Sequence, residues 1–297
     1  MTNDFSLEDF VADTQRSGRL AAEAREELAL AAHVLSRGIF RLSNEQWPQD
    51  RQVVYQEDLA HTLDDAMELV GELIYREASL DLAAAADSLR GWAALIATQS
   101  SFVGAAAVSR AVYESCVLTA AVCDPTLTVE IRAQRALTRR LSRLHASVRF
   151  ADIVNSGDTK EFQAEIDRIL GIATEKGWSV RRARFGVHYL GERFSVEGLT
   201  EEGIGTTGLG EHAWRATSSL VHGEHPEIAQ TWIRFDWKQV PSYLPALWST
   251  GVIAGTEHAL RTVSEYVGAS VLQAEWTEMS RAWDRVCSQL SGWRRDQ

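Results

Sequence analysis

Apolar residues recur at helical spacing over most of this chain of 297 residues. Within residues 7–41 they fall three or four positions apart, at Leu20, Ala24, Leu28, Ala31 and Leu35. Within residues 51–77 the corresponding set is Val54, Leu59, Leu63, Ala66 and Val70. Because such spacing places each set on one face, the pattern predicts two amphipathic helices, with a break around Trp47 and Pro48.

The next stretch, residues 83–123, is largely apolar and predicts two helices with a break near residues 99–104. It ends before Pro125, because the residue that precedes a proline rarely stays helical. Residues 91–109 carry no charge, but they are rich in alanine and serine and lead directly into Arg110 and Glu114. We therefore expect a buried helix of a soluble protein and no membrane segment.

Residues 129–155 predict an amphipathic helix with two distinct stripes. The apolar stripe contains Leu137, Leu141, Leu144 and Val148. On roughly the opposite side, a basic stripe contains Arg132, Arg135, Arg139 and Arg143. A turn at residues 155–158 then precedes a further helix that extends to Lys176.

The periodicity changes after Trp178. Apolar residues alternate with polar ones at Ala183, Phe185, Val187 and Tyr189, which predicts a strand, and residues 194–196 could return as its partner. Residues 199–209 are glycine-rich and predict a loop, residues 210–222 a helix, and residues 232–238 another short strand. Residues 244–271 and 272–293 predict two closing helices.

The predicted fold is therefore mainly α, an elaborated helical bundle with a small β insertion around residues 182–196 and 232–238. Residues 1–98 form an acidic helical subdomain and residues 99–297 a helical bundle with the β insertion, or the two together form a single domain.

Charge is distributed unevenly. The net charge is −11, and residues 1–90 contain 18 acidic and 8 basic residues, which is a balance of −10. Phosphate binding over a wide area needs a basic face, so the sequence predicts no broad DNA-binding surface but allows a local basic site. The three cysteines form no C-x-x-C motif, and the acidic start differs from a secretory signal, which favours a reducing, cytoplasmic location.

Two pairs of residues are candidates for chemistry. Arg110 and Glu114 lie four residues apart within an apolar helix, where they would form either a structural ion pair or the polar floor of a pocket. Arg215 and His222 are about two helical turns apart, so they share a face with Ser218. A histidine can move the proton of an attacking 2′-hydroxyl while an arginine stabilises charge on phosphorus; alternatively, His222 only caps its helix.

The arrangement R-x6-H-G on a late helix resembles the HEPN superfamily, whose members are helical bundles that carry R-x4-6-H. The stretches RAVYESCVLTAAVCDP and RATSSLVHG also resemble a group of actinobacterial helical proteins, and the resemblance covers roughly residues 101–223. It implies metal-independent RNA cleavage or RNA binding in a defence system, with Arg215 and His222 as the active pair supported by Arg110 and Glu114. Ala216 stands where the family usually has a polar residue.

Two charged segments suggest ligands. The basic stripe could bind a phosphate or another ligand through Arg132, Arg135, Arg139 and Arg143, or the acidic residues between Glu57 and Glu72 could neutralise it within the fold or across a dimer. Asp64, Asp65 and Glu68 form a DDxxE string, which in terpene synthases binds Mg²⁺ and diphosphate; the second acidic motif of that family does not occur here. We therefore predict no resident metal or cofactor.

The sequence thus leads to three functional hypotheses. The first is a HEPN-like RNA-cleaving or RNA-binding defence component. The second is a non-catalytic helical protein that acts by interaction, and we expect a homodimer in either case. The third is a specialised-metabolism enzyme, resembling a terpene cyclase, whose apolar ligand lies in a pocket lined by some of the 10 tryptophans and which alone would require Mg²⁺.

Overall fold

A computed structural model shows a mainly helical protein with one small antiparallel hairpin, which confirms the predicted fold class. It describes residues 7–45, 47, 54–63, 68–98, 101–154, 159–183, 186–191, 196, 199 and 243–295. The helices are α1 (Leu7–Asn44), α2 (Val54–Leu59), α3 (Val70–Thr98), α4 (Phe102–Cys123), α5 (Val129–Ile153), α6 (Lys160–Glu175), α10 (Tyr243–Val267) and α11 (Gln273–Arg295). The strands are β1 (Val180–Arg182) and β2 (His188–Leu190).

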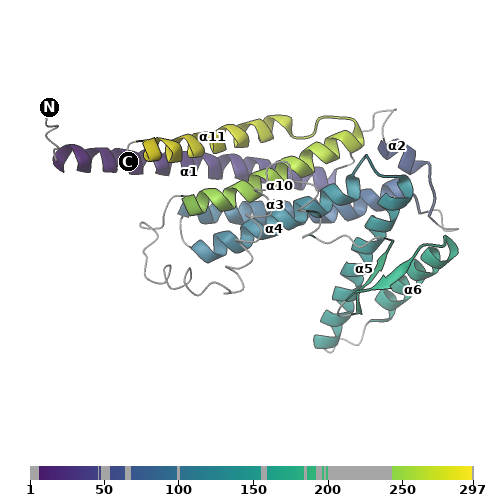
Figure 1. The fold of residues 1–297 in the computed structure, drawn as a ribbon. Helices are drawn as coiled ribbons and strands as arrows, with labels where there is room; N and C mark the ends of the chain where they lie inside the picture. Colours follow the sequence, from purple (N-terminus) through teal and green to yellow (C-terminus); the bar gives the residue numbers. More distant parts are fainter. Residues whose placement is uncertain are drawn as a thin grey trace.

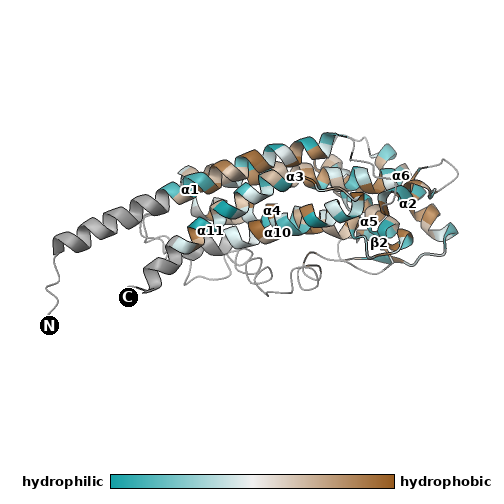
Figure 2. Ribbon diagram, turned by 90° about the horizontal axis from the view of Figure 1, so that it is seen from above, coloured by the Kyte–Doolittle hydropathy of each residue, from teal (hydrophilic) through white to brown (hydrophobic). Residues whose placement is uncertain are grey.

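Five helices, α1, α3, α4, α10 and α11, lie side by side as a long bundle (Figure 1). Polar and apolar residues alternate along α1 and α3 (Figure 2), as expected for helices with one buried face. In α1, Leu28, Leu35 and Ile39 are at most 1% exposed, which places the predicted helical repeat in the core. One continuous core cluster joins residues of all five helices.

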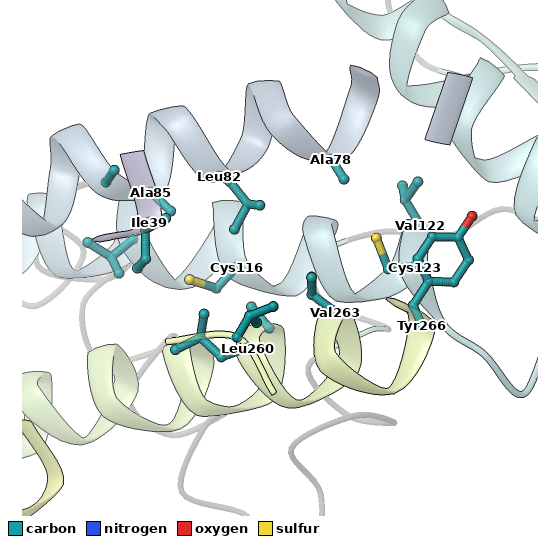
Figure 3. Packing of buried hydrophobic residues seen from close by; sticks show 14 of the residues in the cluster. Ile39, Ala78, Leu82, Ala85, Cys116, Val122, Cys123, Leu260, Val263 and Tyr266 are labelled. Atoms are coloured by element: carbon teal, nitrogen blue, oxygen red, sulfur yellow. The ribbon is translucent and has the colours of Figure 1, made fainter. Parts of the chain in front are cut away.

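The centre of the bundle is packed by small and branched side chains. Figure 3 shows Cys116 of α4 beside Leu260 of α10, with Leu82 of α3 facing them. Burial raises the pKa of the Cys116 thiol to about 12, so this cysteine stays a neutral packing group. At Gly255 of α10, an added Cβ would come within 2.9 Å of the Tyr113 ring, so the close approach of α10 to α4 needs glycine there.

In the described part of the chain, one helical segment, Val103–Cys123 of α4, is long and apolar enough to cross a membrane. Most of it is buried between its neighbours in the bundle, and buried core helices commonly have this composition. The break before α4 lies where the sequence predicts it, because the hydroxyl of Ser101 accepts a hydrogen bond from the backbone N–H of Gly104 at 3.0 Å.

Two predicted elements differ from the observed ones. The single helix expected over residues 51–77 is divided, because α2 ends at Leu59 and the chain folds back, with a bridge between Thr62 and Leu69, before α3 begins. The hairpin lies earlier than predicted: β1 pairs with β2 in the register Val180↔Leu190, and the turn falls between Arg182 and His188. The hairpin is anchored to α5 in this register, since the backbone N–H of Leu190 donates to the Thr138 hydroxyl at 3.0 Å.

Helices α5 and α6 and the hairpin stand together at one end of the bundle (Figure 1). Helix α5 contacts α3 and α4 of the bundle, and it also contacts α6 and β2. The predicted helix at residues 210–222 and the predicted strand at residues 232–238 lie outside the described residues.

Candidate functional site

The residues of the predicted catalytic motif are placed only in part. Arg215, Ser218 and His222 lie outside the described residues, as do Asp64 and Asp65 of the acidic string. The other catalytic candidates form a pair within α4: Nε of Arg110 donates to Oε1 of Glu114 at 2.7 Å. Their side chains are 22% and 31% exposed, which matches an ion pair at the edge of the bundle.

The basic stripe of α5 begins with an ion pair in the protein interior. Nε and Nη2 of Arg132 donate to the two carboxylate oxygens of Asp58 at 2.8 and 2.7 Å, and the hydroxyl of Tyr266 donates to the same carboxylate at 2.7 Å. The side chains of Arg132 and Asp58 are 3% and 0% exposed. This contact ties α5 to α2 and α10, and an outside anion could reach Arg132 only by displacing Asp58.

The stripe continues onto the acidic face of α3. Arg139 donates to both carboxylate oxygens of Asp81, at 3.1 and 2.7 Å. Arg143 contacts Asp81 at 2.8 Å and also donates to Glu77. Arg135 differs, because its Nη1 donates to the Ala121 carbonyl of α4 at 3.0 Å. Each of the four arginines that were predicted to bind a ligand therefore already donates to an acceptor within the protein.

Glu68 connects the stripe to α6. It accepts hydrogen bonds from Arg140 of α5 and Arg168 of α6, each at 2.8 Å, and from Arg76 of α3 at 3.1 Å. Desolvation acts to raise the pKa of Glu68, but the hydrogen bonds from Arg168 and Arg140 outweigh it and lower the pKa. Within the described residues, no group of three or more histidine, cysteine or carboxylate side chains could hold a metal ion.

Two histidines meet where the hairpin packs on α5. Nδ1 of His188 lies 3.1 Å from Nε2 of His145, and the backbone N–H of His188 points to the same Nε2 at 3.4 Å. A backbone N–H can only donate, so Nε2 of His145 is the acceptor and carries no proton. Neutral His145 therefore has its proton on Nδ1, His188 donates from its own Nδ1, and Nε2 of His188 keeps a lone pair.

Three arginines on the same two elements as this histidine pair differ from those of the stripe. Arg149 follows His145 by one helical turn, while Arg181 and Arg182 lie in β1, and all three are exposed. None of the ion pairs within the described residues involves them. We call these three arginines, together with His145 and His188, the basic hairpin surface.

Cross-strand pairing divides the hairpin into two faces. Arg182 pairs with His188 and Val180 with the buried Leu190, so these residues share the face that packs on α5. Arg181 pairs with Tyr189 on the opposite face. Nε of Arg182 donates to the Gly186 carbonyl of the turn at 3.4 Å, which holds this side chain beside the turn.

The pKa of each histidine is lowered. Desolvation lowers the pKa of His145 and is joined by repulsion from His188, Arg149 and Arg182. Desolvation also lowers the pKa of His188, together with repulsion from Arg182. Both rings are therefore neutral at pH 7, and the hydrogen bond between them requires only that Nε2 of His145 is unprotonated.

This surface predicts a loss of stability in mild acid. Because the folded-state pKa values lie below the usual value near 6.5, the unfolded chain binds more protons as the pH falls below about 6.5, and stability is lost there. We expect the melting temperature of the wild-type protein to fall between pH 7.5 and pH 5.5. A variant with glutamine at both His145 and His188 should show a smaller fall in melting temperature over the same interval. The fall that remains comes from other groups such as His258, because burial lowers the pKa of His258 as well. Equal losses in both proteins would contradict this account.

The sequence indicated parts of this surface without joining them. The alternating stretch around residues 182–189 showed Arg182 and His188 on the polar side of a strand, whereas His145 and Arg149 followed the basic stripe on α5. Comparison of the chain with protein-family models, with curated proteins and with solved structures finds no match. The function must therefore be inferred from the chemistry of these side chains.

Proposed function

We propose that this protein binds RNA, and that the basic hairpin surface contacts the phosphate backbone. The observation that carries the proposal is the difference between two groups of arginines on neighbouring elements. Arg132, Arg139 and Arg143 are held by carboxylates of α2 and α3, whereas Arg149 and Arg182 have no carboxylate partner among the described residues. Exposed guanidinium groups without a carboxylate partner are those that can bind phosphate oxygens.

The net charge supports a local contact rather than a wide one. A chain with a charge of −11 repels a polyanion over most of its surface, so an RNA strand would be held only where positive charge gathers. Arg149 lies near the end of α5 and Arg182 lies on the adjacent hairpin, and both act on His145, while Arg181 lies on the other face of the same strand. This arrangement suits a short segment of single-stranded RNA.

The resemblance to HEPN proteins adds a catalytic expectation to this binding role. Cleavage by Arg215 and His222 stays a prediction, since both lie outside the described residues. The homodimer and the small apolar ligand expected from the sequence also stay predictions. The binding role can be tested independently of them all, because it depends on different residues.

The test is the affinity for a fluorescent single-stranded RNA, measured by anisotropy. Changing Arg149, Arg181 and Arg182 to glutamate is expected to weaken binding by about 100-fold, since each exposed contact contributes on the order of 1 kcal/mol. The matched control changes three exposed arginines of the bundle helices, Arg37, Arg90 and Arg261, to glutamate. Because both variants alter the net charge equally, similar losses in the two would show that general charge, and not this surface, governs binding.

A further inference from the structure

We propose that His145, Arg149, Arg182 and His188 form a binding site for a phosphate monoester, such as the terminal phosphate of an RNA strand. This inference rests on the proposed RNA-binding function and names the chemical group that the site selects. Two observations support it. The contact between the two imidazoles leaves the lone pair of Nε2 of His188 available, and the guanidinium groups of Arg149 and Arg182 lie close enough to act on His145.

The hydrogen bonds of His145 determine the role of His188. Nε2 of His145 is occupied by the backbone N–H and by Nδ1 of His188. His188 can therefore accept a proton only at Nε2, and protonation there keeps and strengthens its bond to His145. Protonation of Nε2 of His145 would instead break both contacts that join the hairpin to α5 at this point. His188 is thus the proton acceptor of the pair and His145 is a positioning residue.

The charges around the pair match a dianion. Arg182 lies directly across the hairpin from His188, where paired side chains have Cβ atoms about 5 Å apart. Arg149 lies four residues after His145, on the same side of α5. Among the described residues, Arg149 and Arg182 are the charged neighbours that act on the two imidazoles, and both are cationic. Two cations favour a monoester, with a charge of about −1.5 to −2, over a diester with one charge.

A monoester is also basic enough to share a proton with His188. Its second pKa is near 6, close to that of an imidazole, so the bound dianion can take up one proton from solvent, which is then held between a phosphate oxygen and Nε2 of His188. An internal phosphodiester is too weak a base to share this proton, and it could make only the arginine contacts. The lowered pKa of His188 supports this role, because the ring remains a neutral acceptor until a phosphate arrives.

The experiment compares two RNA oligonucleotides of one sequence that end in a 5′-phosphate or a 5′-hydroxyl. We expect the wild-type protein at pH 7 to bind the phosphorylated strand about tenfold more tightly, as one additional charge-assisted contact would give. His188→Ala and Arg182→Gln should each reduce this ratio to near one. Arg181→Gln is the matched control: it lies next to Arg182 but on the opposite face of the strand, so it should weaken binding of both strands equally.

A competition assay examines the shared proton separately. Inorganic phosphate should displace the phosphorylated strand at lower concentration than sulfate, which is a dianion at pH 7 but is too weak a base to share a proton with His188. His188→Ala should abolish the difference between the two anions, and circular dichroism should show unchanged helix content in each variant. Equal wild-type affinity for both strands, or a preference that survives both His188→Ala and Arg182→Gln, would overturn this inference while leaving RNA binding intact. Failure of the wild-type protein to bind either strand would instead reject the proposed function.

Discussion

Replacing Asp58 by alanine is expected to lower the free energy of unfolding by about 3–5 kcal/mol, which is the usual cost of breaking a buried ion pair. The substitution leaves the Arg132 guanidinium buried without its carboxylate and removes the acceptor of the Tyr266 hydroxyl. Urea denaturation followed by circular dichroism measures the change. A loss below about 1 kcal/mol, as expected for an exposed ion pair, would contradict the buried contact.

Two further variants isolate the cause. Glu57→Ala alters the preceding residue of α2, which is exposed, and should change stability little. Replacing Asp58 by leucine and Arg132 by methionine together removes both charges from the interior. This double variant should be more stable than Asp58→Ala, because no uncompensated charge remains buried. If the double variant is no more stable than the single one, the ion pair is not the source of the loss.

The second large effect is expected at Trp47. Its ring is 1% exposed and lies edge-on to Tyr75, with 5.1 Å between ring centroids, and also contacts Tyr55 and Tyr266. Trp47→Ala should lower the free energy of unfolding by about 3–5 kcal/mol, because it leaves a cavity where α2, α3 and α10 meet. The same urea denaturation measures it.

The control for Trp47 separates packing from hydrogen bonding. Nε1 of Trp47 donates to the Leu42 carbonyl at 3.2 Å. Trp47→Phe removes this bond but keeps an aromatic ring, so it should cost less than Trp47→Ala. Equal losses would mean that the hydrogen bond, and not the packing of the ring, holds the segment after α1 in place.

Periodicity in the sequence was sufficient to predict the helical bundle. The repeat in α1 lies in the core, and the break before α4 occurs at Ser101, where a serine can cap the helix. Periodicity failed at α2, because the apolar positions before and after Leu59 continue at helical spacing although the chain reverses there. The contacts of Asp58 with α5 and α10 stabilise that reversal, and such long-range contacts leave no local pattern.

The arginines of α5 show the same limit. Sequence spacing placed Arg132, Arg139 and Arg143 on one face, and it suggested that acidic residues between Glu57 and Glu72 could neutralise them. Asp58 does so for Arg132, whereas Arg139 and Arg143 are held by Asp81 and Glu77, which lie outside that range. Sequence spacing could not show that Arg149, six residues after Arg143, lies out of reach of the carboxylates of α3, because its position depends on how α5 crosses α3. The histidine pair was equally hidden, because His145 and His188 are 43 residues apart and meet only through the register of the hairpin.

The central claim is that Arg149, Arg181 and Arg182 bind RNA phosphates, and the salt dependence of RNA affinity tests it most directly. Each phosphate contact on a single strand contributes about 0.7 to the slope of log affinity against log salt concentration. Changing the three arginines to glutamine should therefore reduce the magnitude of the slope by about 2 relative to the wild-type protein. The same slope and affinity in both proteins would contradict the claim, because no phosphate would then be bound by this surface.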